Sequence, residues 1–211
     1  MSEIYRWRGG AEHVLRHGAG SPVTLLVLPA LLEEANRMRR FTASVMRHLA
    51  AQNIGTILPD LPGTGESETP LNNVNLLDWH DAVSAVSGNV IGSVAIRGGA
   101  LLDGASKNRW RLAPESGERL LRDMTRATAL SAGVPASEID RQARKVTTRL
   151  AGNVINPTLY VALHDAAPVE AAHITTVEGP KLWRAAEPSD DPAFAKLIAD
   201  DIFAWTKTCG A

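Results

Sequence analysis

Mainly apolar runs alternate along the chain with segments in which apolar residues recur at helical spacing. Val23 to Leu28 is apolar except for Thr24 and is followed by Pro29, a pattern typical of a parallel strand buried on both faces. Gly55 to Leu58 and Ser93 to Ile96 are two further short runs of this kind. A periodic segment such as Met38 to Ala51 predicts a helix between strands, and the alternation as a whole predicts βαβ units and an α/β fold.

The second half of the chain carries the same two patterns. Asn156-Pro157 and Asp191-Pro192 each place a capping side chain before a proline, which is typical of a helix start. Gly133 to Arg149 is polar, and we interpret it as a helix over a mobile connection. The remaining predictions are a helix on Leu76, Trp79, Val83 and Val86, a strand over 110–113, a helix over 117–132, a strand over 173–177, and an apolar helical stripe of Phe194, Leu197, Ile198, Ile202 and Trp205.

Together these elements predict one three-layer α/β/α domain over residues 1–211, with a mainly parallel sheet. The strands at 23–28, 55–58 and 93–96 should be adjacent or nearly so, and the last helix should pack on one face of the sheet. A chain of 211 residues with 45% hydrophobic residues is long enough for one sizeable core. Trp79, Trp110, Trp183 and Trp205 are interpreted as core or capping residues.

Composition argues against several classes of function. The formal net charge is -1, so the chain lacks the basic field that attracts nucleic acid. The polar segment Met1 to Gly10 lacks the apolar centre of a signal peptide, and no apolar run approaches the roughly 20 residues that span a bilayer. Because Cys209 is the single cysteine, an internal disulfide is excluded, and we expect a cytoplasmic protein without a cofactor.

A glycine-rich loop follows the second predicted strand, with the sequence Asp60-Leu61-Pro62-Gly63-Thr64-Gly65-Glu66-Ser67. The two glycines permit positive φ in a sharp turn, and Ser67 can form a hydrogen bond within that turn. By itself this segment is a strand-exit loop. Between two buried strands, it resembles the DxxGxGxS loop that precedes the nucleophile strand of the α/β-hydrolases. The resemblance implies a truncated α/β-hydrolase-like fold.

Three segments are similar to a bacterial subgroup of that family, the exosortase A system-associated hydrolases. The segments are Leu28 to Arg40, Ala113 to Leu121 and Gly179 to Trp183. Members of the subgroup are found beside genes for polysaccharide export and protein sorting. The resemblance therefore implies a role linked to exopolysaccharide or exosortase pathways.

In the α/β-hydrolases the third strand leads into the nucleophile elbow, G-x-S-x-G. The aligned residues here are Ala95-Ile96-Arg97-Gly98-Gly99-Ala100, so Arg97 takes the position of the serine, and no other G-x-S-x-G occurs. The family's histidine follows the last strand, where this chain has Gly179 to Trp183. The short connection that would supply the acid offers no convincing position. The resemblance thus implies a scaffold that lacks the catalytic triad.

Other candidates for catalysis carry little support. His164 and Asp165 are adjacent in sequence, and adjacent side chains rarely orient one another as a base and its carboxylate do. His173 is interpreted as an edge histidine, and Ser93 as a residue inside a buried strand. The remaining histidines lack the mutual spacing of metal ligands, so no metal site is expected.

Arg97 has two interpretations. Its guanidinium either points to solvent or a nearby carboxylate as a relic, or it forms an anion site at a helix start, where Gly98 and Gly99 leave room for a ligand. If the turn keeps the strand-turn-helix geometry of the family's elbow, the backbone of this residue would be strained by about 1 to 3 kcal/mol, and its side chain would approach the loop from Pro29 to Glu34. The predicted ligand-binding residues are Arg97, Gly98, Gly99, Pro29, Ala30, Glu33 and Glu34, with no catalytic residue.

Three functions follow as alternatives. The first is a catalytically degenerate α/β-hydrolase-like protein that binds an anionic small molecule or a protein partner as an accessory factor. The second is an ester, thioester or amide hydrolase with a non-standard catalytic site. The third is a structural protein-interaction module.

Overall fold

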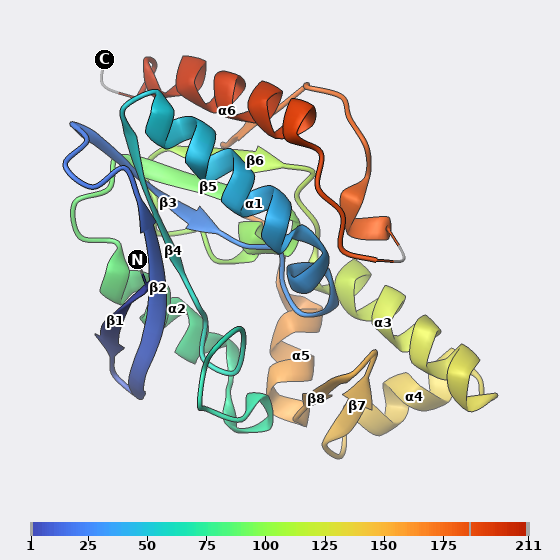
Figure 1. Cartoon of the computed structure of the whole chain (residues 1–211). Helices are drawn as coiled ribbons and strands as arrows, with labels where there is room; N and C mark the ends of the chain where they lie inside the picture. Colours follow the sequence, from blue (N-terminus) through green and yellow to red (C-terminus); the bar gives the residue numbers. More distant parts are fainter. Residues whose placement is uncertain (1, 186, 210–211) are drawn as a thin grey trace.

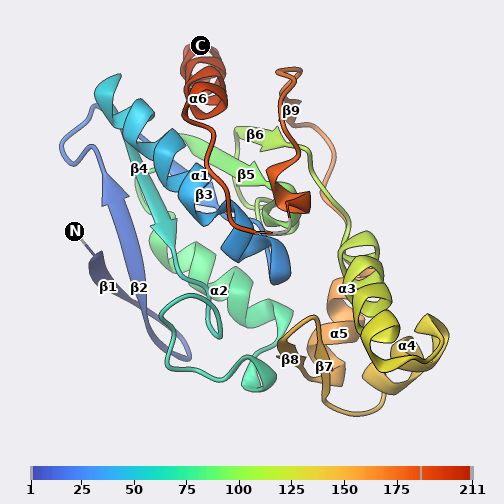
Figure 2. The same ribbon diagram turned by 45° about the vertical axis from the view of Figure 1, so that its right-hand side comes forward.

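The computed structural model describes residues 2–185 and 187–209, which form a mixed β-sheet covered by helices on both faces (Figures 1 and 2). The main sheet has the strand order β1-β2-β4-β3-β5-β6-β9, in which β2 pairs antiparallel with β1 and β4 and the other neighbours are parallel. Its strands are β1 (Ser2–Trp7), β2 (Gly10–His17), β3 (Val23–Leu28), β4 (Ile54–Pro59), β5 (Gly92–Ile96), β6 (Arg109–Leu112) and β9 (His173–Ile174).

The predicted core strands lie side by side. β3 pairs on one edge with β4 and on the other with β5, so that Leu25 is opposite both Thr56 and Gly92. Every residue of β5 is buried, as expected for a strand that is covered on both faces. The predicted α/β class and mainly parallel sheet are therefore confirmed.

Two hydrophobic clusters on opposite faces of the sheet make the three layers. On one face, α1 (Glu33–Ala51) and α6 (Pro192–Thr206) pack side by side, with Phe41 stacked on Phe194. On the other face, α2 (Leu76–Val86) buries Trp79 completely. The last helix packs on the sheet as predicted, but Leu197 of its expected apolar stripe is 53% exposed.

A group of smaller elements projects beyond the carboxyl ends of the parallel strands (Figure 2). Helix α3 (Gly117–Ala132) contacts α4 and α5, and a two-stranded antiparallel hairpin lies against them. The other members are α4 (Ala136–Ala143), β7 (Thr148–Leu150), β8 (Asn153–Ile155) and α5 (Pro157–Asp165). Cap side chains start two of these helices, because Ser116 accepts from the Arg119 amide and Asn156 from the Leu159 amide.

The structure differs from the predicted elements at three places. A five-residue 3₁₀ turn, Arg97–Leu101, stands where an α-helix was predicted. The strand predicted over 173–177 pairs only through His173–Ile174. The hairpins β1–β2 and β7–β8 were not predicted, because their strands are either largely polar or only three residues long and so lack a clear apolar pattern.

Within the described residues, no helix combines the length and apolar character that a membrane span requires. The same residues contain no group of histidine, cysteine, aspartate and glutamate side chains arranged to hold a metal ion.

Candidate functional site

The turn after β5 has the strained backbone that was predicted for it. Arg97 has a φ of 54°, in the left-handed region that side chains other than glycine rarely adopt. A Cβ atom on Gly99 would lie 2.5 Å from the Leu28 carbonyl oxygen and 2.6 Å from that of Pro29. Gly99 therefore allows the turn to pack closely against the end of β3, and the room beside it is filled by protein.

The guanidinium of Arg97 is buried and bound on three sides. Nε and Nη2 donate to the two carboxylate oxygens of Glu34 over 3.0 and 2.9 Å, and Nη2 also donates to Glu115 over 3.1 Å. Nη1 donates to the carbonyl oxygen of Ala113 over 3.0 Å, and the side chain is only 8% exposed. The predicted pairing of Arg97 with Glu34 is thus confirmed, whereas Glu33 pairs with Arg37 instead.

Trp183 covers the remaining face of the guanidinium. The Arg97 Cζ lies 4.7 Å from the centre of the indole ring, at a distance typical of a cation–π contact. Trp183 belongs to a short 3₁₀ turn, Leu182–Arg184, and its carbonyl oxygen accepts a hydrogen bond of 3.1 Å from Arg37 on α1. The segment in which the resemblance would place a histidine therefore supplies an indole ring, packed on the Arg97 side chain.

The electrostatics of this cluster do not favour a further anion. One guanidinium is shared by Glu34 and Glu115, and Arg119 adds a contact to Glu115 of 3.3 Å from a half-exposed position. Burial raises the pKa of Glu34, and the hydrogen bond from Arg97 opposes that rise. Because the turn is a short 3₁₀ segment, the helix start on which the predicted anion site depended is also absent at residues 97–101.

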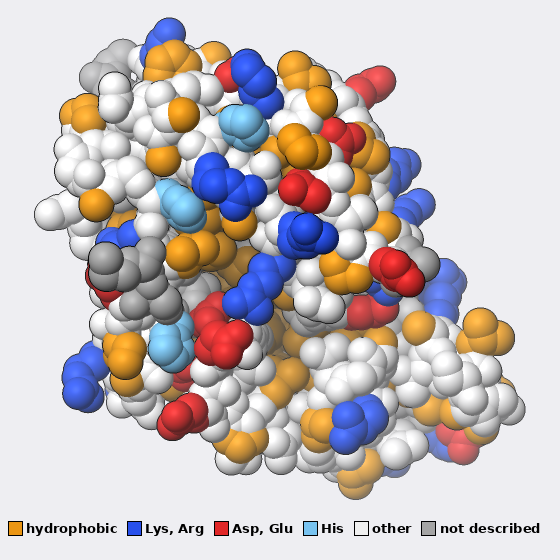
Figure 3. Space-filling model, in the orientation of Figure 1, with side chains coloured by type: hydrophobic (Ala, Val, Ile, Leu, Met, Phe, Trp, Pro, Cys, Tyr) orange, Lys and Arg blue, Asp and Glu red, His pale blue; other side chains and the backbone are white. Residues whose placement is uncertain are grey.

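A cavity of about 350 Å³ opens next to this cluster, at the carboxyl ends of β3 and β4. In Figure 3 the surface is hollowed between the part that carries α1 and the part that carries α3 to α5, and hydrophobic side chains show at the bottom of the hollow. Ligands of open α/β sheets commonly bind at this end of the strands. The cavity is lined by Pro29, Ala30, Leu31, Leu32, Ala35, Asn36, Arg39, Thr42, Leu58, Pro59, Asp60, Leu61, Gly63, Thr64, Gly65 and Asn153.

The predicted ligand-binding residues divide between the cavity and the cluster. Pro29 and Ala30 line the cavity, and Glu34 belongs to the buried ion cluster around Arg97. Gly98 packs against Leu31, since a Cβ at Gly98 would lie 3.2 Å from the Leu31 side chain. Leu31, Leu32 and Arg39 are cavity residues that the sequence interpretation missed, although the apolar residues directly after Pro29 were a usable signal.

The glycine-rich loop forms one wall of the cavity. Gly63 and Gly65 have φ angles of 78° and 57°, and the Gly63 amide donates to Ser67 Oγ over 2.9 Å. The Asp60 carboxylate accepts from the Glu66 amide over 3.1 Å and lies against Gly65, where a Cβ would clash with it. The predicted turn conformation and the hydrogen bond of Ser67 within it are both confirmed.

The other catalytic candidates do not assemble into a nucleophile and base. His164 Nδ1 and Asp165 Oδ1 are 3.0 Å apart, so the expectation that these neighbours would not orient one another was wrong, but Asp165 is 71% exposed. His173 lies 3.7 Å from Asp201, and Ser93 is completely buried with no partner for its hydroxyl group. Around Arg97, the described part of the chain shows no hydrogen bond between a serine or cysteine and a histidine.

Comparison with known proteins gives structural neighbours only. No protein-family model matches the sequence, and no curated protein matches it. Similar solved structures include an epoxide hydrolase from Vigna radiata (19% identity, TM-score 0.44, covering 53% of this chain and 39% of that one). The epoxide hydrolase of potato (20%, 0.42, 53% and 39%) and an alpha-beta serine hydrolase homologue from Coxiella burnetii (14%, 0.43, 54% and 62%) are further examples.

The chain spans about two fifths of the length of the epoxide hydrolases that it matches, since 39% of each is covered. The fold itself is evident from the molecule: helices on both faces, a mainly parallel sheet with β2 antiparallel, and a strained turn after the central strand β5. The chain therefore has a three-layer α/β/α fold with a mainly parallel sheet.

Proposed function

We propose that the protein is a binding or accessory factor built on an α/β-hydrolase-like scaffold that no longer uses a serine mechanism. This proposal rests on the surroundings of the Arg97 side chain. The side chain at the nucleophile position is enclosed by Glu34, Glu115 and Trp183 and is therefore occupied in holding the structure together. A general base beside a hydroxyl group, which acyl transfer by serine requires, has no counterpart there.

The ligand that fits best is a small anionic molecule with an apolar portion, such as a carboxylate with an acyl chain. Leu31, Leu32 and Leu61 give the cavity a hydrophobic lining, which suits an apolar chain. Arg39 lines the cavity with a 62% exposed side chain, whose one ion pair among the described residues is a 3.6 Å contact to Glu66. An anionic head group would find its charge partner in this guanidinium, and not in the neutralised Arg97.

The sequence also supports a pathway for this proposed accessory factor. The three segments similar to the exosortase A system-associated hydrolases support a role in bacterial exopolysaccharide or exosortase pathways. We place the protein in the cytoplasm as one domain. As an accessory factor, the same scaffold would bind a protein partner. Pull-down from a native host, followed by identification of co-purified polysaccharide-pathway proteins, tests this part of the proposal.

The purified protein is expected to remain unlabelled by a fluorophosphonate probe, because no activated serine stands at the elbow. Arg97→Ser is likewise expected to hydrolyse nitrophenyl esters no faster than the native protein, since no histidine lies beside position 97 to deprotonate the new hydroxyl group. An active serine esterase labelled in parallel is the control. Labelling of the native protein, or ester turnover by Arg97→Ser, would support the alternative of a hydrolase with a non-standard site.

Filling the cavity is expected to abolish binding of an acyl ligand. Ala35 lies on the first turn of α1, lines the cavity and is partly exposed, so Ala35→Trp should occupy the space with little effect on folding. Octanoate binding, measured by calorimetry, should fall at least tenfold, with octanol as the uncharged comparison and Ala51→Trp at the other end of α1 as the control. Equal binding by all three proteins, or none by the native one, would contradict this assignment of the cavity.

A further inference from the structure

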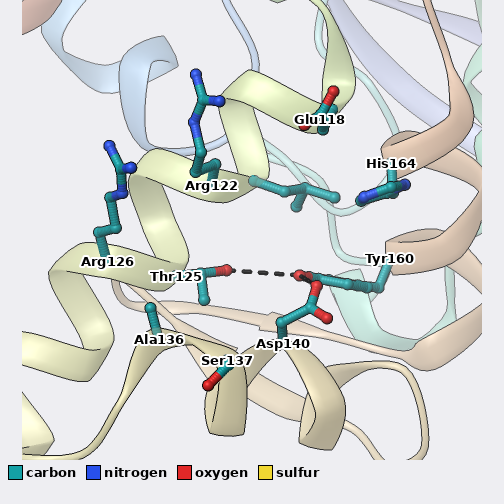
Figure 4. A pocket seen from close by; sticks show the side chains of 10 residues that line it. Glu118, Arg122, Thr125, Arg126, Ala136, Ser137, Asp140, Tyr160 and His164 are labelled. Carbon is teal, nitrogen blue, oxygen red and sulfur yellow. Dashed lines mark hydrogen bonds between the residues drawn. The ribbon is translucent and has the colours of Figure 1, made fainter.

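A second pocket, of about 340 Å³, lies between the projecting helices α3, α4 and α5, away from the cavity at the strand ends. Most of its lining residues are polar or charged and include Arg122 and Arg126 on α3, Ser137 and Asp140 on α4, and Tyr160 and His164 on α5. Figure 4 shows Arg122 and Arg126 side by side on α3, with their guanidinium groups extended away from Thr125 and Tyr160 and with His164 on the opposite side of the pocket. This volume is sufficient for a small polar molecule.

The two arginines carry positive charge that the protein does not neutralise. They are one helical turn apart, which places their Cβ atoms about 5 to 6 Å from one another, and like charges at this spacing repel. Neither forms an ion pair with any residue in the described part of the chain. By contrast, Arg119 on the same helix contacts Glu115 over 3.3 Å. An unpaired pair of guanidinium groups beside a concave surface is a suitable partner for the oxygens of an anion.

The acidic groups of the pocket do not cancel this charge. Asp140 accepts hydrogen bonds from Arg144 over 3.0 Å and from the Tyr160 hydroxyl over 2.7 Å, so it is already paired. Glu118 remains as one carboxylate against the two guanidinium groups of Arg122 and Arg126. When Arg144, which lies outside the lining, is counted with its partner Asp140, the pocket and this pair together keep an excess of one positive charge before His164 is counted.

Hydroxyl groups and a carboxylate also line the pocket. Tyr160 is almost completely buried, and its hydroxyl oxygen lies 3.5 Å from that of Thr125, both in the lining of the pocket. Ser137 and Glu118 add a donor and an acceptor that have no partner among the described residues. Such groups hydrogen-bond the hydroxyl groups of a polyol, whereas the guanidinium pair suits a dianionic phosphate.

We propose that this pocket binds the phosphate monoester of a small polyhydroxylated molecule, such as a sugar phosphate, with the phosphate between Arg122 and Arg126. The proposal concerns a site separate from the cavity assigned above and does not depend on the function proposed for that cavity. Binding rests on two charge-assisted contacts, so loss of both arginines should weaken it at least tenfold.

The test is calorimetric titration of the native protein with glucose 6-phosphate, inorganic phosphate, gluconate and glucose. Glucose 6-phosphate should bind best, inorganic phosphate more weakly, and glucose not measurably. The R122Q/R126Q variant should lose at least tenfold in affinity for glucose 6-phosphate. The R40Q/R47Q variant, which removes two exposed arginines of α1 and the same net charge, should change by less than twofold.

Each other outcome overturns the proposal. Equal weakening in both double variants would show attraction to overall charge, and gluconate binding as tightly as glucose 6-phosphate would show that phosphate is not recognised. Absence of binding to the native protein would remove the site altogether. Because all four arginines are exposed, the variants should unfold at nearly the temperature of the native protein, and circular dichroism on heating verifies that they are folded.

Discussion

Replacing Arg97 with alanine is expected to lower the free energy of unfolding by about 3 to 5 kcal/mol, the usual cost of removing one partner from a buried ion pair. Glu34 and Glu115 would remain in the protein with side chains 12% and 11% exposed and without their shared cation. The strained φ at this position would persist, because alanine also carries a Cβ, so relief of strain would not offset that loss. Denaturation in urea, analysed for both proteins at pH 7, measures the difference.

The loss should depend on pH in a defined direction. Burial raises the pKa of Glu34 above its ordinary value of 4.5, and removing Arg97 would raise that pKa further, because Arg97 is the group that lowers it. A carboxyl group with a raised pKa in the folded state favours folding most below its unfolded pKa, and this stabilisation disappears as the pH rises through the folded pKa. The difference between Arg97→Ala and the native protein should therefore be smallest near pH 4.5 and grow toward neutral pH.

A matched variant separates the lost ion pair from lost packing. Arg97→Met combined with Glu34→Gln and Glu115→Gln removes all three charges and retains much of the volume, so it should recover a large part of the stability. A loss below about 1 kcal/mol in Arg97→Ala would instead be the size expected of an exposed pair. A loss that is the same at pH 4.5 and pH 7 would contradict the role assigned to the carboxylates.

The core elements were predictable because burial leaves a clear pattern in the sequence. Val23 to Leu28 has the same bounds in the prediction and in the structure, since a strand covered on both faces is mainly apolar, and its last four residues are buried. The helices that begin at Pro157 and Pro192 were located by their asparagine and aspartate caps, and both caps form the expected hydrogen bond. The hairpin β1–β2 was missed because only alternate residues of an edge ribbon face the core.

The site was predictable only where local sequence determines it. The family resemblance predicted the strained turn at Arg97. The carboxylates in the loop from Pro29 to Glu34 then predicted the pairing of Arg97 with Glu34. Glu115 and Trp183 were not assigned to Arg97, because they come from other elements and meet it only after the sheet has formed. The pocket between α3, α4 and α5 was likewise invisible, since its walls come from three helices whose mutual packing the sequence pattern does not give.

Replacing Asp103 with alanine is the second change expected to have a large effect, about 3 to 5 kcal/mol of unfolding free energy. Asp103 is completely buried and accepts two hydrogen bonds of 2.7 Å from Nε and Nη2 of Arg111 on β6. The third nitrogen of that guanidinium donates to the carbonyl oxygen of Val169 over 2.7 Å, which joins the segment before β9 to the sheet. Without the carboxylate, Arg111 would remain charged, buried and short of two acceptors.

The exposed pair of Lys196 and Asp200 provides the control for this effect, because its side chains are 62% and 43% exposed. Lys196→Ala should change stability by less than about 1 kcal/mol, since water solvates the remaining carboxylate. The double change of Asp103→Leu and Arg111→Met should be far less harmful than Asp103→Ala alone, because it leaves no unpaired charge in the core. A loss after Asp103→Ala as small as that after Lys196→Ala would mean that water reaches Arg111. It would then contradict the conclusion that the buried pair of Asp103 and Arg111 holds β6 and the segment before β9 together.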